Sequence, residues 1–339
     1  MIVMNEQNNS AIADRVVVKV PASTANLGPG FDSLGMALSL YAWVSLAPAS
    51  ETRITLHGDN LGGVPLDKSN LVYEVAQAVF SRAGVQLPEL DIAIRSDIPL
   101  TRGLGSSAAA IVGALVAANA LIGDPLAKDE LFQMATALEK HPDNVGASLY
   151  GGIVVAAWDG ARAELVRLEP PAGMAVLAAI PRFELATKKA RGILPESLSL
   201  SDAVFNVCHS SLLTAALASG RLDLLRFAMR DRLHQPYRAP LIPGMEKILS
   251  EACDNGALGA VLSGAGPTLL LLAEAGAGEE ERLVSFVKQT MKDAGIDVET
   301  MWLEPCLYGP QVRKLSKESS EYGDAPDRIL AASEAEVGA

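Results

Sequence analysis

Cysteine is scarce in this chain of 339 residues, and so are long apolar runs. The three cysteines, Cys208, Cys253 and Cys306, show no Cys-x-x-Cys spacing, which gives no support for a disulfide framework or a thiolate zinc site. No apolar run reaches the ~18 residues of a membrane span without polar interruption. The N-terminus is too polar for a signal peptide. We therefore expect a soluble protein of the cytoplasm without a membrane partner.

Positive charge is also in deficit, because the formal net charge is −12. Nucleic acids and anionic membranes are bound through basic patches, so we expect no nucleic-acid partner. Any positive potential for an anionic ligand must then be local. Aromatic residues make up only 5% of the chain, whereas hydrophobic residues as a whole make up 49%. Ala, Val, Leu and Ile must therefore build most of the core, and the length favours two domains.

One familiar phosphate-binding sequence, the Walker loop, is absent, because Gly-x-x-x-x-Gly-Lys-Ser/Thr occurs nowhere. Residues 103–108 do match the dinucleotide fingerprint G-x-G-x-x-A. Its acidic partner should end a second strand about 20 residues further on. Asp124 has roughly that spacing but lies in a Gly-Asp-Pro turn directly after a predicted helix. The context therefore excludes a Rossmann site.

A different glycine-rich loop is present between a strand-like run, residues 91–98, and an alanine-rich helical run, residues 108–121. Because Gly103 and Gly105 have no β-carbon, backbone N–H groups can close around phosphate oxygens there. Ser106 and Ser107 can cap the helix or reach a metal. The free N–H groups and the helix dipole favour an anion. An ordinary Gly/Ser helix start is the alternative. We interpret the stretch as a nucleotide-phosphate loop made of Pro99, Leu100, Thr101, Arg102, Gly103, Leu104, Gly105, Ser106, Ser107, Ala108 and Ala109.

Candidate polar side chains for a second ligand occur on both sides of this loop in the sequence. Asn26 and Asp32 lie in a Gly/Pro-rich segment, residues 22–35, which could line a polar pocket or form an ordinary turn. Thr187 and Arg191 are one helical turn apart and can therefore face one site.

The end of a predicted helix over residues 128–140 offers further ligands. Glu139 carries the carboxylate that magnesium prefers, although a solvated helix cap is the more common use of such a residue. Pro142 prevents simple continuation of the helix. We therefore expect three side chains to project from a turn here: His141, Asp143 and Asn144.

The domain organisation is predicted from changes in pattern. A buried strand over residues 15–20 should end at Pro21. The pattern changes after Asp159-Gly160, which predicts domains over residues 15–160 and 161–313. A second glycine-rich turn, residues 263–268, joins two strand-like runs and could be a simple hairpin. Residues 314–339 are acidic with little hydrophobic periodicity, so we expect this tail to be disordered or loosely attached.

In this order, the motifs resemble those of the GHMP kinases, a family named for galactokinase, homoserine kinase, mevalonate kinase and phosphomevalonate kinase. The resemblance spans about residues 15–310. Within the family the chain is most similar to the homoserine kinases. The segments that carry these resemblances are Val20-Pro-Ala-Ser-Thr-Ala-Asn-Leu-Gly-Pro-Gly-Phe-Asp32, residues 99–109, His141-Pro-Asp-Asn144, Thr187-Lys-Lys-Ala-Arg191, His234-Gln-Pro-Tyr-Arg238 and Ser263-Gly-Ala-Gly-Pro-Thr268.

The resemblance implies an α+β, two-domain GHMP kinase fold. The first domain would be like the second domain of ribosomal protein S5, the second would be ferredoxin-like, and the substrates would meet in the cleft between them. The loop of residues 99–109 would bind the ATP phosphates, together with Ser263, Gly264 and Gly266. Ser106 or Ser107 would hold Mg²⁺ with Glu139. The family often has Gly where this chain has Lys140.

The same resemblance places L-homoserine among Asn26, Asp32, His141, Asp143, Asn144 and Thr187, with Arg191 and Arg238 on its carboxylate. Guanidinium forks suit a carboxylate, and Asp32 or Asp143 could hold the ammonium group. Asn144 stands where mevalonate kinases have an aspartate base. Phosphoryl transfer needs mostly positioning, so we expect Asn26 and Asn144 to align the hydroxyl without a carboxylate base.

The implied reaction is ATP-dependent formation of O-phospho-L-homoserine for threonine biosynthesis, catalysed by a homodimer. One alternative keeps the fold and changes the acceptor to another carboxylate-bearing alcohol such as mevalonate. A preference for L-homoserine over its des-amino analogue would distinguish the two. The other alternative is a non-catalytic nucleotide sensor, which would not need to retain Ser106, Ser107, Glu139 and both arginines.

Overall fold

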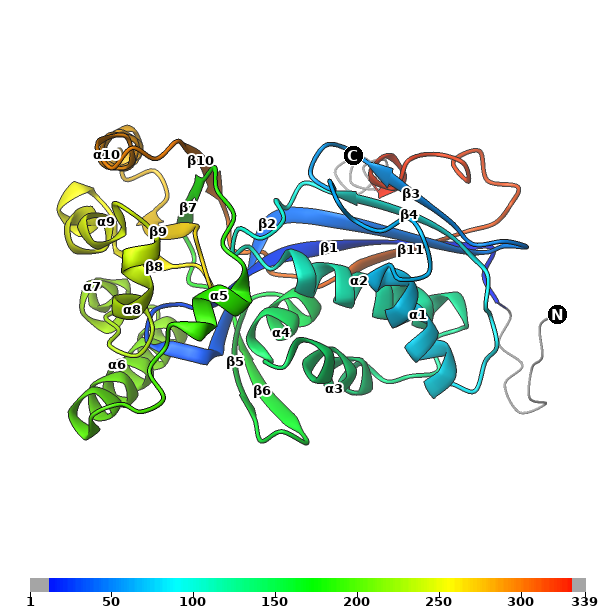
Figure 1. The fold of residues 1–339 in the computed structure, drawn as a ribbon, viewed down its shortest axis with the longest axis horizontal. Helices are drawn as coiled ribbons and strands as arrows, with labels where there is room; N and C mark the ends of the chain where they lie inside the picture. The colour runs from blue at the N-terminus through cyan, green and yellow to red at the C-terminus, as the bar shows by residue number, and fades with distance from the viewer. Residues whose placement is uncertain (1–11, 331–339) are drawn as a thin grey trace.

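Two β-sheets, each covered by helices, form the two parts of the molecule in a computed structural model that describes residues 12–330 (Figure 1). The mixture of helices and sheets agrees with the predicted α+β class. The first sheet has the order β11-β1-β2-β4-β3, and the hairpin of β5 and β6 extends from β2. Its strands are β1 (Arg15–Asn26), β2 (Gly30–Pro48), β3 (Arg53–His57), β4 (Leu90–Ser96), β5 (Ile153–Trp158), β6 (Ala163–Leu168) and β11 (Gln311–Leu315).

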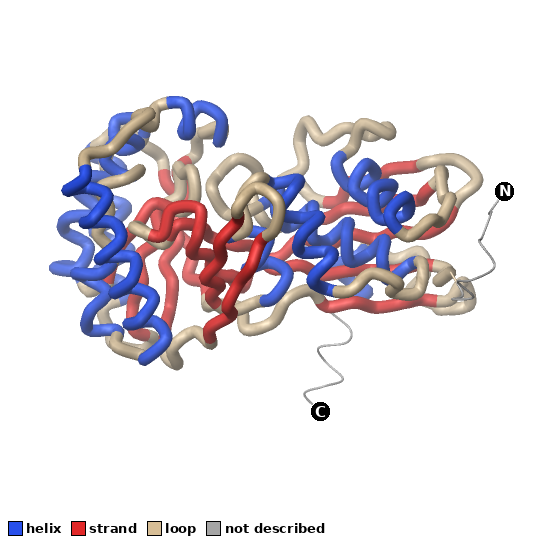
Figure 2. The backbone as a smooth tube through the Cα atoms, turned by 90° about the horizontal axis from the view of Figure 1, so that it is seen from below, coloured by secondary structure: helices blue, strands red, loops and turns tan. Residues whose placement is uncertain are grey.

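Helices cover one face of this first sheet. They are α1 (Leu71–Arg82), α2 (Ser106–Leu121), α3 (Lys128–Glu139) and α4 (Asp143–Tyr150), and seen from below they lie over the long strands (Figure 2). Most of α2 is buried, because its side chains are nearly all Ala, Val, Ile and Leu. The sheet and the neighbouring helices therefore hold α2 on several sides and fix the loop at its start.

Two proline positions differ from the sequence prediction. Pro21 does not end β1, because the strand continues to Asn26 across a register shift between Pro21 and Ala22. A bulge leaves this residue without a ladder bond to donate, which suits a proline. Pro142 does not lead into a turn but is the N-cap of α4, where no intrahelical N–H bond is required. His141 therefore lies in a bend before α4, as predicted, whereas Asp143 and Asn144 lie in the first turn of that helix.

The second sheet contains β7 (Met174–Pro181), β8 (Gly259–Leu262), β9 (Leu269–Glu274) and β10 (Val298–Leu303), in the order β10-β7-β9-β8. All neighbours are antiparallel. The succession β7, helices, β8, β9, α10, β10 is the β-α-β-β-α-β arrangement of a ferredoxin-like domain, as expected. Its helical elements are α5 (Thr187–Gly192), α6 (Leu200–Ser219), η1 (Leu222–Leu224), α7 (Leu225–Ala228), α8 (Gln235–Arg238), η2 (Ala239–Leu241), α9 (Met245–Glu251), η3 (Ala252–Asn255) and α10 (Glu280–Asp293).

The predicted domain boundary at residue 160 is wrong. Asp159 and Gly160 form the turn of the β5–β6 hairpin, and β6 pairs with β5 in the first sheet. The chain enters the second sheet only at β7. It returns to the first sheet at the end, where β11 pairs with β1. A local change of pattern therefore marked a hairpin turn instead of a change of sheet.

The disorder or loose attachment predicted for residues 314–339 is contradicted as far as residue 330. Ile329 and Leu330 are buried against Val17, Trp43 and Leu315, on the sheet face opposite the helices. A few well-placed apolar side chains suffice to hold this acidic segment, although it lacks periodicity. The part of the prediction that concerns residues 331–339 lies outside the described residues. Within residues 12–330, no helix combines the length and the apolar character needed to cross a membrane.

Candidate active site

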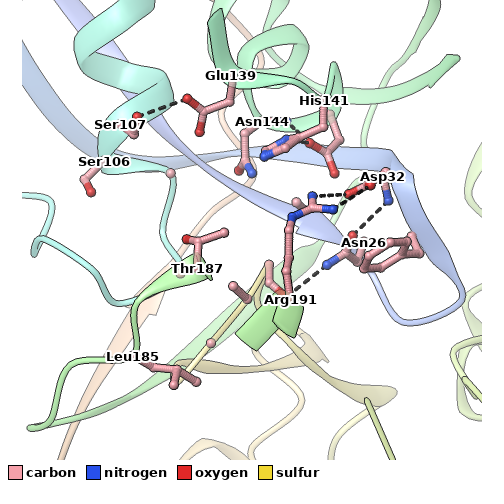
Figure 3. A pocket seen from close by; sticks show the side chains of 18 of the residues that line it. Asn26, Asp32, Ser106, Ser107, Glu139, His141, Asn144, Leu185, Thr187 and Arg191 are labelled. Atoms are coloured by element: carbon pink, nitrogen blue, oxygen red, sulfur yellow. Dashed lines mark hydrogen bonds and ion pairs between the residues drawn. The ribbon is translucent and has the colours of Figure 1, made fainter. Parts of the chain in front are cut away.

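A cavity between the two sheets collects side chains from distant parts of the chain (Figure 3). Most predicted site residues line it: Asn26, Asp32, Thr101, Gly103, Gly105, Ser106, Ser107, Glu139, His141, Asp143, Asn144, Thr187, Arg191, Arg238, Gly264 and Gly266. Four residues for which no role was predicted also line the cavity: Ala25, Phe31, Leu185 and Ala265. The structure thus brings the predicted phosphate loop and the predicted acceptor residues to one place.

The predicted phosphate loop leads directly into α2. Gly105 is the N-cap with φ 70°, and no side chain in the described part of the chain caps the helix. The first N–H groups of α2 are therefore available to an anion. A β-carbon on Gly105 would lie 2.3 Å from Ser23 Oγ, so the loop needs glycine for space as well as for backbone conformation.

The second glycine-rich turn joins β8 and β9 as a hairpin, and it also supports the phosphate loop. Ser263 Oγ donates to Gly103 O at 2.5 Å, and Thr268 N donates to Arg102 O at 3.2 Å. A β-carbon on Gly103 would lie 2.4 Å from Ser263 O. The turn is therefore a hairpin and also lies against the predicted phosphate loop. Ser263 itself lies behind the cavity wall.

Some residues of the predicted loop do not line the cavity. Leu104, Ala108 and Ala109 are buried in the first core. Pro99 and Leu100 precede the cavity wall, and Arg102 donates to Leu100 O and lies 3.8 Å from Glu184. These residues support the loop, whereas Thr101, the two glycines and the two serines line the cavity.

Ser107 and Glu139 bring two oxygen ligands together. Ser107 Oγ donates to Glu139 Oε2 at 3.0 Å, across the gap between the start of α2 and the end of α3 (Figure 3). The helix ends at Glu139 because Lys140 adopts a left-handed conformation, φ 69°, which normally favours glycine. A hydroxyl and a carboxylate are ligands suited to a hard cation.

Asp32 and Arg191 form an ion pair across the cavity. Both terminal nitrogens of Arg191 donate to the Asp32 carboxylate, at 3.0 and 2.6 Å. Asn26 supports this loop, because its Oδ1 accepts from Asp32 N and its Nδ2 donates to Gly264 O. Asn26 and Asp32 both have positive φ, at 72° and 54°, and such strain is typical of functional loops.

Asp143 has one engaged and one free carboxylate oxygen. Its Oδ1 lies 2.7 Å from His141 Nδ1 and accepts from Asn144 N at 2.7 Å. Its Oδ2 is buried and has no hydrogen-bond partner among the described residues. Burial alone lowers the pKa of His141, but the hydrogen bond and charge of Asp143, with Glu139 and Asp32, raise it above its ordinary value. A buried carboxylate oxygen without a donor is a binding position for a cation or donor group.

The amide of Asn144 is oriented by two buried serines. Ser148 Oγ donates to Ser23 Oγ at 3.0 Å, and Ser23 Oγ donates to Asn144 Oδ1 at 3.0 Å. Both serines are fully buried. With Oδ1 engaged as an acceptor, Asn144 keeps its NH₂ group as the donor for a ligand. Ser23 and Ser148 were not predicted as site residues, because their partners lie more than one hundred positions away in the chain.

Arg238 is almost fully buried, and only some of its N–H donors have hydrogen-bond partners. Its Nε donates to Ala190 O, and its Nη1 donates to Gly264 O and His234 Nδ1. No hydrogen bond within residues 12–330 involves its Nη2. Burial and the charge of Arg191 lower the pKa of Arg238 to about 10, so it remains a cation at neutral pH. Arg238 therefore presents a charged donor to the cavity that it lines.

Comparison with known proteins identifies the family. Residues 70–152 match the model of the GHMP kinases N terminal domain, and residues 213–296 match that of the GHMP kinases C terminal domain. The chain is 44% identical over 296 residues to the homoserine kinase of Moorella thermoacetica, an alignment that covers 87% of this chain and 99% of the relative. It is 48% identical over 261 residues to the homoserine kinase of Deinococcus radiodurans, and this alignment covers 77% of this chain and 85% of the relative.

Solved structures agree with this result. A homoserine kinase from Cytophaga hutchinsonii superimposes with a TM-score of 0.80 at 29% identity, over 92% of this chain and all (100%) of the other. The mevalonate kinase of L. major, solved with R-mevalonate, has a TM-score of 0.63 at 18% identity over 89% of this chain and 98% of the other, and shows the shared fold only. This protein is a GHMP kinase, and the chain belongs to the homoserine kinase family.

Proposed function

We propose that the protein transfers the γ-phosphoryl group of ATP to the hydroxyl of L-homoserine and releases O-phospho-L-homoserine. The observation that carries the acceptor assignment is the free, buried Oδ2 of Asp143 in the wall of the cavity. An α-ammonium group would supply the missing donor and charge. Asp32 is less suited to this task, because Arg191 already holds both of its oxygens.

The carboxylate of the substrate would lie against the arginines. Arg238 is buried and keeps Nη2 free, and Arg191 borders the same cavity while Asp32 balances its charge. Planar guanidinium groups bind carboxylates through charge-assisted hydrogen bonds. An acceptor held by Asp143 at one end and Arg238 at the other is an amino acid, whereas mevalonate would leave Asp143 Oδ2 unpaired.

The nucleotide would bind with its phosphates at the start of α2. Mg²⁺ fits the donors present, because it binds one or two carboxylates plus phosphate oxygens and water. Glu139 and a hydroxyl of Ser106 or Ser107 would hold the ion, which neutralises phosphate charge when it is bound. Thr187, at the start of α5, lies across the cavity from Ser106 and would contact the acceptor (Figure 3).

The chain's own residues would align the acceptor hydroxyl instead of deprotonating it. The Asn144 amide is neutral, and Ser23 turns its NH₂ group toward a ligand. Asn26 Oδ1 already accepts from Asp32 N, which keeps the amide in place beside the acceptor. The proton would leave to phosphate or solvent. The proposal further includes a homodimer that acts in the cytoplasm in threonine biosynthesis, which the family resemblance supports.

Coupled measurement of ADP release tests the acceptor assignment. L-Homoserine, its des-amino analogue and mevalonate are compared with the wild type, the Asp143→Asn variant and the Glu139→Ala variant. We expect the wild type to prefer L-homoserine by at least about 100-fold in kcat/KM. The other two acceptors lack the α-ammonium group and would leave the buried Asp143 carboxylate without a charged partner. Asp143→Asn should erase most of that preference, and Glu139→Ala should lower the rate with every acceptor.

Two results would contradict the proposal. A wild type that prefers mevalonate or the des-amino analogue would assign another carboxylate-bearing alcohol as the substrate. Equal, very low ADP release from wild type and Glu139→Ala with all acceptors would indicate a nucleotide-binding protein without kinase activity.

A further inference from the structure

His234 lies where the two domains meet and has a hydrogen-bond partner in each of them. It is fully buried and immediately precedes α8, the short helix that carries Arg238. Asp231 fixes this turn, because its Oδ2 accepts from the backbone N–H groups of His234 and Gln235 at 3.0 and 2.7 Å. Asn206 of α6 donates to the other oxygen of Asp231 at 2.7 Å. The backbone therefore holds the imidazole ring in place. Its Nε2 also lies 3.6 Å from Asp231 Oδ2, which is too far for a hydrogen bond, so both ring nitrogens can bond to other partners.

Each ring nitrogen contacts a different domain. His234 Nδ1 lies 3.1 Å from Nη1 of Arg238, and His234 Nε2 lies 2.8 Å from Gly28 O, in the turn between β1 and β2. A guanidinium group can only donate, so Nδ1 must accept and Nε2 must carry the proton. The histidine is thus a neutral tautomer that accepts from Arg238 and donates to Gly28. Burial, which is the main cause, lowers the pKa of His234 and favours this state.

We infer that His234 is a positioning residue for the acceptor carboxylate: it holds the Arg238 guanidinium by its Nδ1 acceptor and ties that arginine to the Asn26–Asp32 loop through Gly28. The inference rests on the proposed function, in which Arg238 binds that carboxylate. With Nε and Nη1 fixed by Ala190 O, Gly264 O and His234, the guanidinium plane and the directions of the two Nη2 N–H donors are fixed. Loss of the Nδ1 acceptor would remove one of the three hydrogen bonds that hold the guanidinium, leaving those to Ala190 O and Gly264 O, and would not touch the nucleotide loop.

Two amide variants separate the two nitrogens of the ring. In His234→Asn the Oδ1 atom replaces Nδ1 as an acceptor for Arg238, while the donor to Gly28 is lost. In His234→Gln the longer amide can donate from near the Nε2 position, while the Nδ1 acceptor is lost. A histidine that only filled space would respond to both variants alike, because both remove the ring.

The test measures kcat and KM for L-homoserine and for ATP in the wild type and both variants, with thermal unfolding as a check on folding. We expect KM for L-homoserine to rise about tenfold or more in His234→Gln, because a hydrogen bond to a charged group is lost. It should rise no more than about threefold in His234→Asn, and KM for ATP should stay within about twofold in both.

Equal changes in the two variants, or a parallel rise in KM for ATP, would overturn the inference. So would a His234→Gln variant whose KM for L-homoserine equals that of the wild type. The wild type separates this result from a failure of the proposed function. If wild type does not phosphorylate L-homoserine, the proposed function is wrong, whereas an active wild type with an unaffected His234→Gln variant removes only the role of His234.

Discussion

At the scale of single residues, the most informative position is Asn144. The Ser23 hydroxyl fixes the orientation of its side-chain amide. Asn144→Asp would place a negative charge in a cavity that is proposed to bind polyphosphate, and it would remove the NH₂ donor. We expect kcat to fall by at least about tenfold, as when a transition-state donor is removed. The pH–rate profile should not acquire the rising limb of a carboxylate base. The measurement is kcat against pH for wild type and variant with L-homoserine.

A matched variant strengthens this test. Ser23→Ala leaves Asn144 in place but removes the hydroxyl that fixes its amide, so we expect a smaller loss in kcat than for Asn144→Asp. Faster turnover by Asn144→Asp, with activity that rises as a carboxylate titrates, would show that the site can use a base and would refute the alignment mechanism.

His141 predicts a pH dependence of acceptor binding. Its pKa is raised, mainly by Asp143 against the effect of burial, so it carries a proton at pH values where an ordinary histidine, with a pKa of about 6.5, is neutral. An imidazolium beside Asp143 competes with the substrate ammonium. KM for L-homoserine should therefore fall as pH rises from about 6.5 through the raised pKa. Steady-state kinetics over this range should show the trend in wild type and a flat profile in His141→Asn.

Thermal unfolding gives an independent check of the raised pKa of His141 beside Asp143. Because the folded pKa of His141 is raised, its contribution to stability is complete below the unfolded value of about 6.5 and is lost as pH rises through the folded pKa. The stability difference between wild type and His141→Asn should shrink accordingly with rising pH. A difference that grew with pH would contradict the assigned direction of the pKa shift.

At the scale of elements, the sequence predicted those segments whose pattern is local. The apolar composition of α2 predicted burial, and the spacing of Thr187 and Arg191 predicted the turn of helix that became α5. The continuation of β1 past Pro21 depends on pairing with β2, and α4 depends on Pro142 acting as an N-cap. The continuation of β1 needs a partner strand that the local pattern does not contain, and the pairing of Ser23 with Asn144 is likewise non-local. The start of α4 was missed for a different reason, because Pro142 was interpreted only as the end of one helix although a proline is also compatible with the start of the next.

The junction of loop and α2 predicts the effect of Gly105→Ala. The new β-carbon would meet Ser23 Oγ, and the left-handed backbone of Gly105 costs about 1 kcal/mol for alanine. We expect KM for ATP to rise about tenfold or more, because the loop must shift at the proposed phosphate site. Steady-state kinetics and denaturant unfolding measure the two effects.

Gly63→Ala is the matched control for this prediction. Gly63 also has positive φ, 81°, but a β-carbon there would meet nothing within 4 Å. This variant should lose a similar amount of stability through its backbone and keep the KM for ATP of the wild type. Nearly equal values of KM for ATP in both variants would mean that the start of α2 does not determine nucleotide binding.

At the scale of the whole molecule, the resemblance predicted the two-domain fold that composition alone could only suggest. The boundary was misplaced because Asp159-Gly160 resembles a linker but turns a hairpin. Most of the residues that the continuous motifs single out line one cavity, and their roles stay predictions. The internal pairing of the cavity was not predicted, because Asp32 with Arg191 and His234 with Gly28 join positions more than one hundred residues apart.

The docking of the C-terminal segment leads to a prediction about stability without an effect on catalysis. Ile329 is fully buried with Leu330 against Val17 and Trp43, on the sheet face away from α1–α4 (Figure 1). None of these four residues lines the cavity. Ile329→Ala should lower the free energy of unfolding by about 2–4 kcal/mol, as expected for a large-to-small core change. Both KM values should stay unchanged. Denaturant unfolding and steady-state kinetics measure these effects on the full chain.

Val312→Ala provides the comparison on the adjacent strand β11, because Val312 pairs with Val18, on the other face of the sheet, and is 43% exposed. Removing exposed methyl groups should cost under about 1 kcal/mol. If Ile329→Ala were as mild as Val312→Ala, residues 316–330 would not be packed on the sheet in solution. A rise in either KM would instead connect this outer face to the cavity. The expected result, a loss of stability alone, follows from the alternation of β1, in which Val16 and Val18 face the helices and Val17 faces the C-terminal segment.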